Sequence, residues 1–258
     1  MEYTKCRRHR ATEGFTLIEL SIVLVIIGLL VGGVMTGQNL VKQAKFRAMI
    51  KEQDDVQQAI NIFRVQYNAF PGDFNNAFAY WSQKCGSTAE KCNGNGDRKI
   101  TISGTDADRM EGYRFWQHLN LAGIYPGAFT GVGGGAGATA VAGTIGVNIP
   151  GSKLKGIGMT AIYESAADHQ TSATTHTGNV LMFGGMVPNA IASGTQFSAP
   201  DAYQVDTKTD DGNPLTGHVL SIGTTGSGDA DCVDNTLSPA TYNLDATDAT
   251  PCGVAVTF

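Results

Sequence analysis

The chain has 258 residues and a mass of 27.1 kDa; 42% of the residues are apolar and only 16% are charged. This length and composition fit one globular domain with an additional segment, and they exclude a disordered chain, which would be poor in apolar residues. The formal net charge of -5 makes nucleic acid an unlikely partner, because a phosphate backbone repels an acidic protein.

The strongest pattern in the sequence is an apolar run over residues 15–35, which only Thr16, Glu19 and Ser21 interrupt. At 1.5 Å per residue a helix of this length rises about 32 Å, close to the ~30 Å hydrocarbon core of a bilayer. The run therefore predicts a membrane-spanning helix. A secretory signal peptide is the alternative, but its apolar region usually has only about 7–15 residues and contains no carboxylate.

Glu19 is the unusual residue of this run, because a carboxylate inside a membrane costs about 2.5–3.5 kcal/mol on insertion scales. The run contains no Lys, Arg or His that could pair with it. Cleavage between Gly14 and Phe15 would create an α-amino group about one helical turn before Glu19. This amine could neutralise Glu19 of the same chain or of an adjacent subunit. Alternatively, Glu19 reaches the lipid head-group layer.

The residues around this bond resemble the N-terminal signature of type IV prepilins and of the pseudopilins of type II secretion. They follow a short basic leader and read Gly14-Phe15-Thr16-Leu17-Ile18-Glu19-Leu20. The resemblance implies that a prepilin peptidase cuts after Gly14 and that the new Phe15 amine is methylated. It also implies that Glu19 pairs with the N-terminus of the neighbouring subunit during assembly. Many members carry a proline about eight residues after the helix glycine, where this chain has Thr36.

Four segments are expected from these observations: a leader at 1–14, a transmembrane and filament-core helix at 15–37, an amphipathic stalk helix at 38–70, and a globular head at 71–258. Apolar residues recur at spacings of three and four in the stalk, and Pro71 and Gly72 end this pattern. Loss of the leader removes four basic and two acidic side chains, which changes the net charge from -5 to -7.

The resemblance also predicts where the chain resides. It implies a bacterial inner-membrane protein that spans the membrane once, with its head in the periplasm. It also implies that an inner-membrane assembly platform assembles copies of this protein, together with other pilins or pseudopilins, into an extracytoplasmic filament. A basic cluster follows the span, at Lys42, Lys45, Arg47 and Lys51. It could contact membrane lipid or acidic groups of other subunits, or form a solvated helix face.

The head is predicted to be α+β, with the long N-terminal helix packed on an antiparallel sheet and with long loops, which is consistent with the pilin-like fold that the resemblance implies. Runs of β-branched and aromatic residues predict strands at 179–186, 217–222 and 253–258. A short amphipathic helix is predicted at 111–122. The glycine-rich stretch at 131–151 is expected to be a flexible surface segment.

The cysteines predict disulfides rather than a metal site. Cys6 belongs to the leader, and the four remaining cysteines form an even set in an exported chain. Local pairing would join Cys85 to Cys92 and Cys232 to Cys252. Zinc is disfavoured because the chain has no Cys-x-x-Cys pair.

Calcium is the one metal that two stretches of the sequence suggest, although no cofactor is expected to be required. Oxygen-bearing side chains alternate with glycine over residues 93–97, which end at Asp97, and a second acidic group contains Asp206, Asp210 and Asp211. The alternative is plain turn chemistry at both stretches, because Asn, Asp and Gly dominate tight turns.

No pattern predicts an enzyme: the chain lacks a G-x-S-x-G turn, an H-E-x-x-H helix and a Walker loop. The histidines His118, His169, His176 and His218 are scattered and are expected at the surface or in turns. The sequence therefore predicts a structural subunit of a type II secretion pseudopilus or of a type IV pilus-like filament. The alternative is a membrane-anchored adhesive or binding module that does not polymerise.

Overall fold

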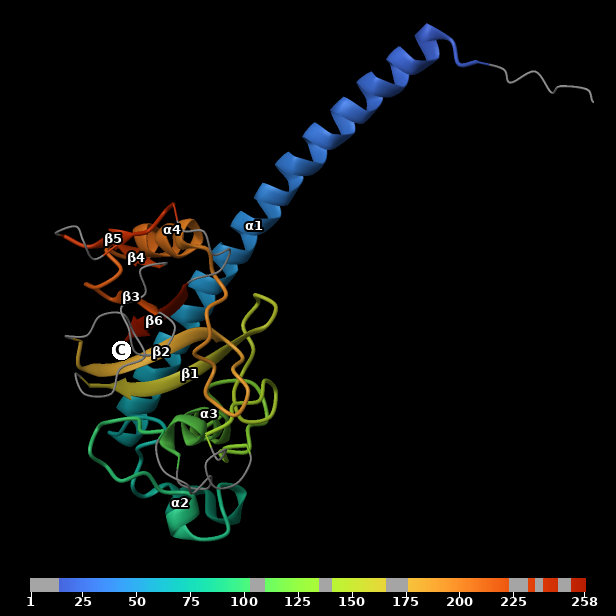
Figure 1. Ribbon diagram of the computed structural model, residues 1–258. Helices are drawn as coiled ribbons and strands as arrows, with labels where there is room; N and C mark the ends of the chain where they lie inside the picture. The colour runs from blue at the N-terminus through green and yellow to red at the C-terminus, as the bar shows by residue number, and fades with distance from the viewer. Residues whose placement is uncertain are drawn as a thin grey trace, which may run out of the picture. The chain divides into compact units, whose positions relative to one another are not determined.

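The computed structural model describes residues 14–102, 110–134, 141–165, 176–222, 232–234, 239–245 and 252–258. Contacts within the chain divide it into two compact units, residues 1–44 and residues 45–258. We call the second of these the globular unit. Helix α1 (Leu17–Tyr67) begins in the first unit and ends in the globular unit (Figure 1).

Helix α1 has an apolar first part and an amphipathic second part, which confirms the predicted long N-terminal helix. Residues 17–45 are exposed, whereas α1 side chains at spacings of three and four are buried from Phe46 to Phe63. The helix ends where Asn68 adopts a left-handed backbone conformation with φ of 52°. Pro71 follows three residues later and cannot continue a helix.

An antiparallel sheet of four strands forms the centre of the globular unit, in the order β1-β2-β6-β3. The strands are β1 (Ile157–Glu164), β2 (Gly178–Gly185), β3 (Val219–Ile222) and β6 (Gly253–Thr257). The three predicted strands correspond to β2, β3 and β6, and the α+β, pilin-like fold is confirmed. The sequence analysis missed β1 and a small second sheet of β4 (Val233–Asp234) and β5 (Thr241–Tyr242).

Both faces of the main sheet are covered. Successive side chains along a strand point to opposite faces and so belong to two different core clusters. Leu181, Phe183 and Val254 belong to the larger core cluster, which also contains the buried side chains of α1. Their neighbours Val180 and Met182 belong to a smaller cluster on the other face. Figure 1 shows the later turns of α1 crossing behind the strands.

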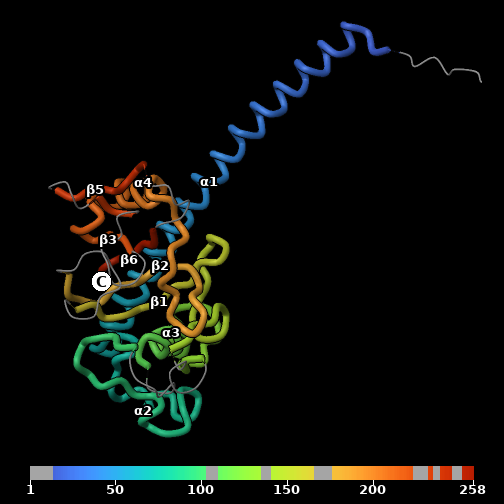
Figure 2. Tube along the Cα trace, in the orientation of Figure 1, coloured from blue at the N-terminus to red at the C-terminus, as the bar shows by residue number. Residues whose placement is uncertain are grey.

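Five shorter helical elements of the described residues lie at the two edges of the sheet. The chain from residue 77 to residue 121 contains α2 (Ala77–Trp81), two 3-10 turns (Ser82–Lys84 and Ala89–Lys91) and α3 (Glu111–Leu121). The trace in Figure 2 places α2 and α3 beyond the edge strand β1, and α4 (Ala199–Thr209) beyond the other edge strand, β3, together with β4 and β5. The helix predicted at 111–122 is α3, whereas α4 was not predicted.

Two disulfides stabilise the globular unit, and they join the cysteines that local pairing predicted. Cys85 is bonded to Cys92, and Cys232 is bonded to Cys252. The second bond connects residues next to β4 and β6, so it ties the small sheet to the main sheet.

The surface location expected for residues 131–151 is wrong at the end of that stretch. Asn148 and Ile149 are buried, and the Asn148 side-chain amide donates hydrogen bonds to the carbonyl oxygens of Val132 and Ala142. These bonds hold two parts of the stretch together around one buried amide.

Candidate functional site

The predicted cleavage bond lies directly before the first turn of α1. Gly14, Phe15 and Thr16 are outside the helix and exposed, and the Phe15 side chain is 88% exposed. Exposed, non-helical segments are the preferred sites of proteolysis. The geometry therefore suits processing between Gly14 and Phe15.

Glu19 lies in the first turn of α1, where it forms a capping box with Thr16. The Thr16 N–H and the Thr16 hydroxyl donate to Glu19 Oε2 at 2.8 Å and 2.7 Å, and the Glu19 N–H lies 3.3 Å from the Thr16 hydroxyl oxygen. This reciprocal arrangement satisfies backbone donors that a helix start otherwise leaves unpaired. Both Thr16 donors reach the same carboxylate oxygen. The other oxygen, Oε1, accepts no hydrogen bond from any residue that the structure describes.

The surface around and beyond Glu19 is apolar. Every large apolar side chain from Leu17 to Val41 is at least half exposed. Among the described residues, α1 is the one helix that is long and apolar enough to cross a membrane. A continuous apolar surface of this kind requires lipid or other protein to cover it.

A comparison with protein families identifies this region. A family model described as the prokaryotic N-terminal methylation motif matches residues 9–35. The chain carries a prepilin-type processing signal. This is the cleavage and methylation signal of type IV pilins and pseudopilins, so the predicted resemblance is confirmed for the N-terminal segment. No curated protein and no solved structure matches the chain.

The prepilin-type signal and the long apolar helix α1 together fit a membrane-anchored, single-pass protein. The proteins known to carry this signal are structural pilin-like subunits and not enzymes, and both features of this chain fit that class. Gly14, Phe15 and Glu19 all lie within the matched residues, but their individual roles stay predictions.

The first candidate calcium residue, Asp97, lies beside two acids that the sequence analysis did not select. Carboxylate oxygens of Asp73, Asp97 and Glu111 lie within 4.8 Å of one another. Asp73 already accepts hydrogen bonds from the backbone N–H groups of Gly96, Asp97 and Arg98. Burial raises the pKa of Asp73 to about 6, against the lowering effect of these bonds.

The second candidate group, Asp206, Asp210 and Asp211, also comes together at the end of α4. Asp206 accepts hydrogen bonds from the Gly212 N–H and from the hydroxyl of the buried Tyr242, both at 3.0 Å. Burial raises the pKa of Asp206 to about 6, because the ionised form loses solvation.

In both groups the carboxylates hold turns in place. Asp210 accepts from two backbone N–H groups next to β3, and Asp211 accepts from the Asn213 N–H and the Thr216 hydroxyl. Backbone and side-chain donors thus occupy several of the oxygens that a calcium ion would need. Calcium binding stays a prediction for both groups.

His118 corrects the expectation for the histidines. It is fully buried in α3, beside the Cys85–Cys92 disulfide. The Gly72 N–H donates to His118 Nδ1 at 3.0 Å, so the ring proton lies on Nε2, which is 3.0 Å from the Cys92 carbonyl oxygen. Burial lowers the pKa of His118 to about 3, and the ring is therefore neutral at neutral pH.

The other histidines need no correction. His218 is exposed and His176 is half-buried, whereas His169 lies outside the described residues. A sequence signal for the burial of His118 exists: it follows Phe115 by three residues, which places both on one face of a helix.

Proposed function

We propose that this chain is a structural subunit of a pilin-type filament, either a type II secretion pseudopilus or a type IV pilus-like filament. The observation that carries the proposal is the prepilin-type signal joined to a helix whose large apolar side chains from Leu17 to Val41 are at least half exposed. In a membrane, lipid covers these side chains. In a filament, the same helices of neighbouring subunits cover them, and the buried area stabilises the assembly.

Glu19 sets the axial register of the subunits in this proposal. Cleavage after Gly14 and methylation of Phe15 leave a positively charged N-terminus in an apolar core. A carboxylate is the group that neutralises it, and Oε1 of Glu19 is available for a second donor while Oε2 keeps its bonds to Thr16. The ion pair between the amine of one subunit and Glu19 of the next then fixes the axial position of the two subunits.

The remaining partners follow from this role. A prepilin peptidase removes residues 1–14, lipid of the bacterial inner membrane holds the processed chain with its head in the periplasm, and an assembly platform moves it into the filament. The basic residues after the span, Lys42 to Lys51, contact lipid head groups before assembly or acidic groups of other subunits afterwards.

Replacing Glu19 tests the register role. We expect Glu19→Ala to be cleaved and methylated normally, with a mass that begins at methylated Phe15. Its filament yield should fall at least about tenfold, because a charge without a partner in an apolar core is strongly unfavourable. Ser21→Ala is the matched control, since it removes a polar group from the same turn region and leaves the carboxylate. Normal filament yield from Glu19→Ala would refute the register role.

The processing role has its own test in Gly14→Ala. We expect this variant to retain its leader and to remain unassembled. A retained leader together with normal filaments would contradict the processing role. If processed wild-type subunits stay dispersed in detergent and no cross-links form between their α1 helices, the chain is a membrane-anchored adhesive or binding module instead.

The two filament types differ in what deletion of the gene removes. Loss of exported enzymes would identify a secretion pseudopilus, whereas loss of long filaments that can be sheared from cells would identify a pilus.

A further inference from the structure

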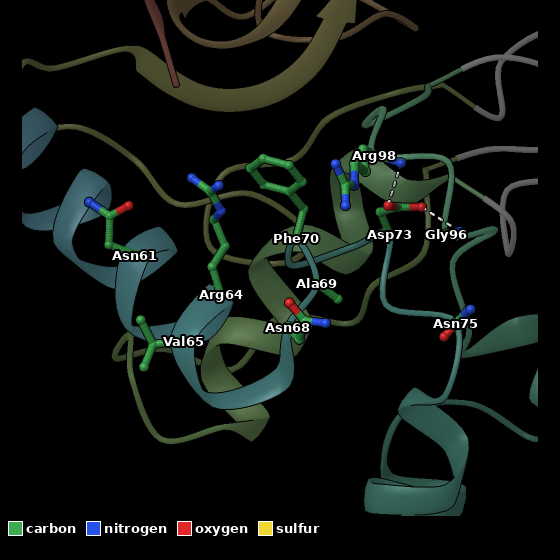
Figure 3. Close-up of a pocket in the computed structure, with 10 residues that line it drawn as sticks. All are labelled: Asn61, Arg64, Val65, Asn68, Ala69, Phe70, Asp73, Asn75, Gly96 and Arg98. Carbon is green, nitrogen blue, oxygen red and sulfur yellow. Dashed lines mark hydrogen bonds between the residues drawn. The ribbon is translucent and has the colours of Figure 1, made fainter.

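The globular unit contains a pocket of about 710 Å³ that none of the roles above uses. It lies between the last turns of α1, the turn that follows them, and the loop that contains Gly96 and Arg98 (Figure 3). A volume in this range accommodates a small ligand or side chains inserted from another protein.

Two arginines dominate the charge of this pocket. The guanidinium carbon of Arg64 lies 4.7 Å from the centre of the Phe70 ring, and Arg98 also lines the pocket (Figure 3). Neither arginine forms an ion pair with a carboxylate of the described residues. The one acid that lines the pocket, Asp73, accepts backbone N–H groups of the 96–98 loop. Among the described residues that line the pocket, two arginines therefore stand against one acid, and that acid is already bound to backbone N–H groups.

The backbone at Arg98 supports a role in binding. Arg98 has a φ of 68°, a left-handed conformation that residues other than Gly, Asn and Asp rarely adopt. It stands in a loop rich in Asn, Asp and Gly, where glycine would carry no such strain. Strained backbone of this kind is concentrated at sites that bind ligands.

The residues around the arginines favour a protein ligand that carries carboxylates. A guanidinium group matches the geometry of a carboxylate with two parallel hydrogen bonds. Val65, which also lines the pocket, is 88% exposed, and arginine beside aromatic and exposed apolar side chains is typical of protein interfaces.

The same chain can supply the acid. Without residues 1–14 it has a net charge of -7, and the exposed carboxylates of the globular unit include Asp54, Asp211 and Asp245. We propose that the pocket at Arg64 and Arg98 binds exposed carboxylate side chains of a second copy of the chain. This inference rests on the proposed filament function, because a filament brings many copies together.

Carbodiimide cross-linking of the double variant Arg64→Lys/Arg98→Lys tests the proposal. The variant keeps both positive charges and adds amines, which carbodiimide joins directly to any carboxylate in contact. Sheared filaments or membranes that contain the full processed chain are treated, and the species of twice the subunit mass is digested and analysed by mass spectrometry. We expect peptides that join residue 64 or residue 98 to an Asp or Glu of a second copy.

Gln66→Lys is the matched control, because it adds an amine at an exposed residue of α1 outside the pocket. A cross-linked dimer that is no more abundant than in this control would overturn the proposal. Links from residue 64 or 98 only to Asp73 of the same chain, or only to a different protein, would also overturn it. Charge reversal in Arg64→Glu/Arg98→Glu should lower filament yield about tenfold, because like charges across an interface repel.

These outcomes distinguish a failure of the pocket proposal from a failure of the proposed filament function. Wild-type filaments that form while no link from residue 64 or 98 is found refute the pocket proposal alone. If the wild type forms no filaments, the proposed function is wrong. Links between two copies in membranes would then still support binding of one copy by the other.

Discussion

Acid sensitivity of the globular unit should depend on His118. Its ring is fully buried, and both nitrogens are engaged, one by the Gly72 N–H and the other with the Cys92 carbonyl oxygen. Protonation would place a positive charge in the core and would remove the acceptor for Gly72. Arg114 adds an unfavourable like charge. The folded state therefore resists protonation, whereas an unfolded chain accepts the proton readily.

The size of the effect follows from the two pKa values. The pKa of His118 is about 3 in the folded state and 6.5 in the unfolded state. Below the higher value the unfolded state binds more protons, so the free energy of unfolding falls as the pH falls. Between pH 7 and pH 5 this single group should lower it by about 2 kcal/mol, since one pKa unit corresponds to about 1.36 kcal/mol.

The assay compares urea unfolding of the wild type and His118→Asn at both pH values, with the full chain in detergent. Tryptophan fluorescence reports on the site, because the Trp81 ring centre lies 5.2 Å from that of His118. Asn keeps an acceptor near Gly72 and does not titrate. Asp73 and Asp206, with pKa values raised to about 6, titrate in both proteins and act in the opposite direction, so only the difference between the proteins counts. If both proteins lose the same stability between the two pH values, the reasoning about His118 is wrong.

Two further predictions concern the other stabilising features. Replacing Cys232 and Cys252 by Ser should lower the free energy of unfolding by about 3 kcal/mol, the loop-entropy value for a separation of 20 residues, and a loss below about 1 kcal/mol by urea unfolding would contradict it. If the acidic group at the end of α4 binds calcium, calcium at about 100 times its Kd should add about 2.7 kcal/mol to the stability of the wild type. Asp211→Asn should lose most of this gain; equal thermal shifts for both proteins, or none for the wild type in millimolar calcium, would contradict a site there.

The local parts of the fold could be predicted from the sequence, because their signals lie close together in the chain. The helix pattern of α1 runs to Tyr67, and Pro71 marks its end. Strand β6 is a short apolar run after a glycine. By contrast, β1 combines Gly158 and Ala161 with the buried Met159 and Thr160, so neither alternation nor a continuous β-branched run marks it.

The contacts of the candidate sites could not be predicted in the same way, because they join distant residues. Asp73 meets the loop at Asp97 across 24 positions, through backbone N–H groups that carry no sequence signal. His118 reaches Gly72 across 46 positions. The pocket between Arg64 and Arg98 likewise depends on how the chain after α1 folds back. The cleavage signal, in contrast, is a local pattern and was found in full.

The position of β6 has a consequence for biosynthesis. This strand is made after the other strands that the structure describes, yet it pairs with both β2 and β3 and lies between them. A nascent chain that has not reached residue 253 therefore leaves the two inner edges of the sheet without partners. The four-stranded sheet can therefore close only after residue 257 has left the ribosome.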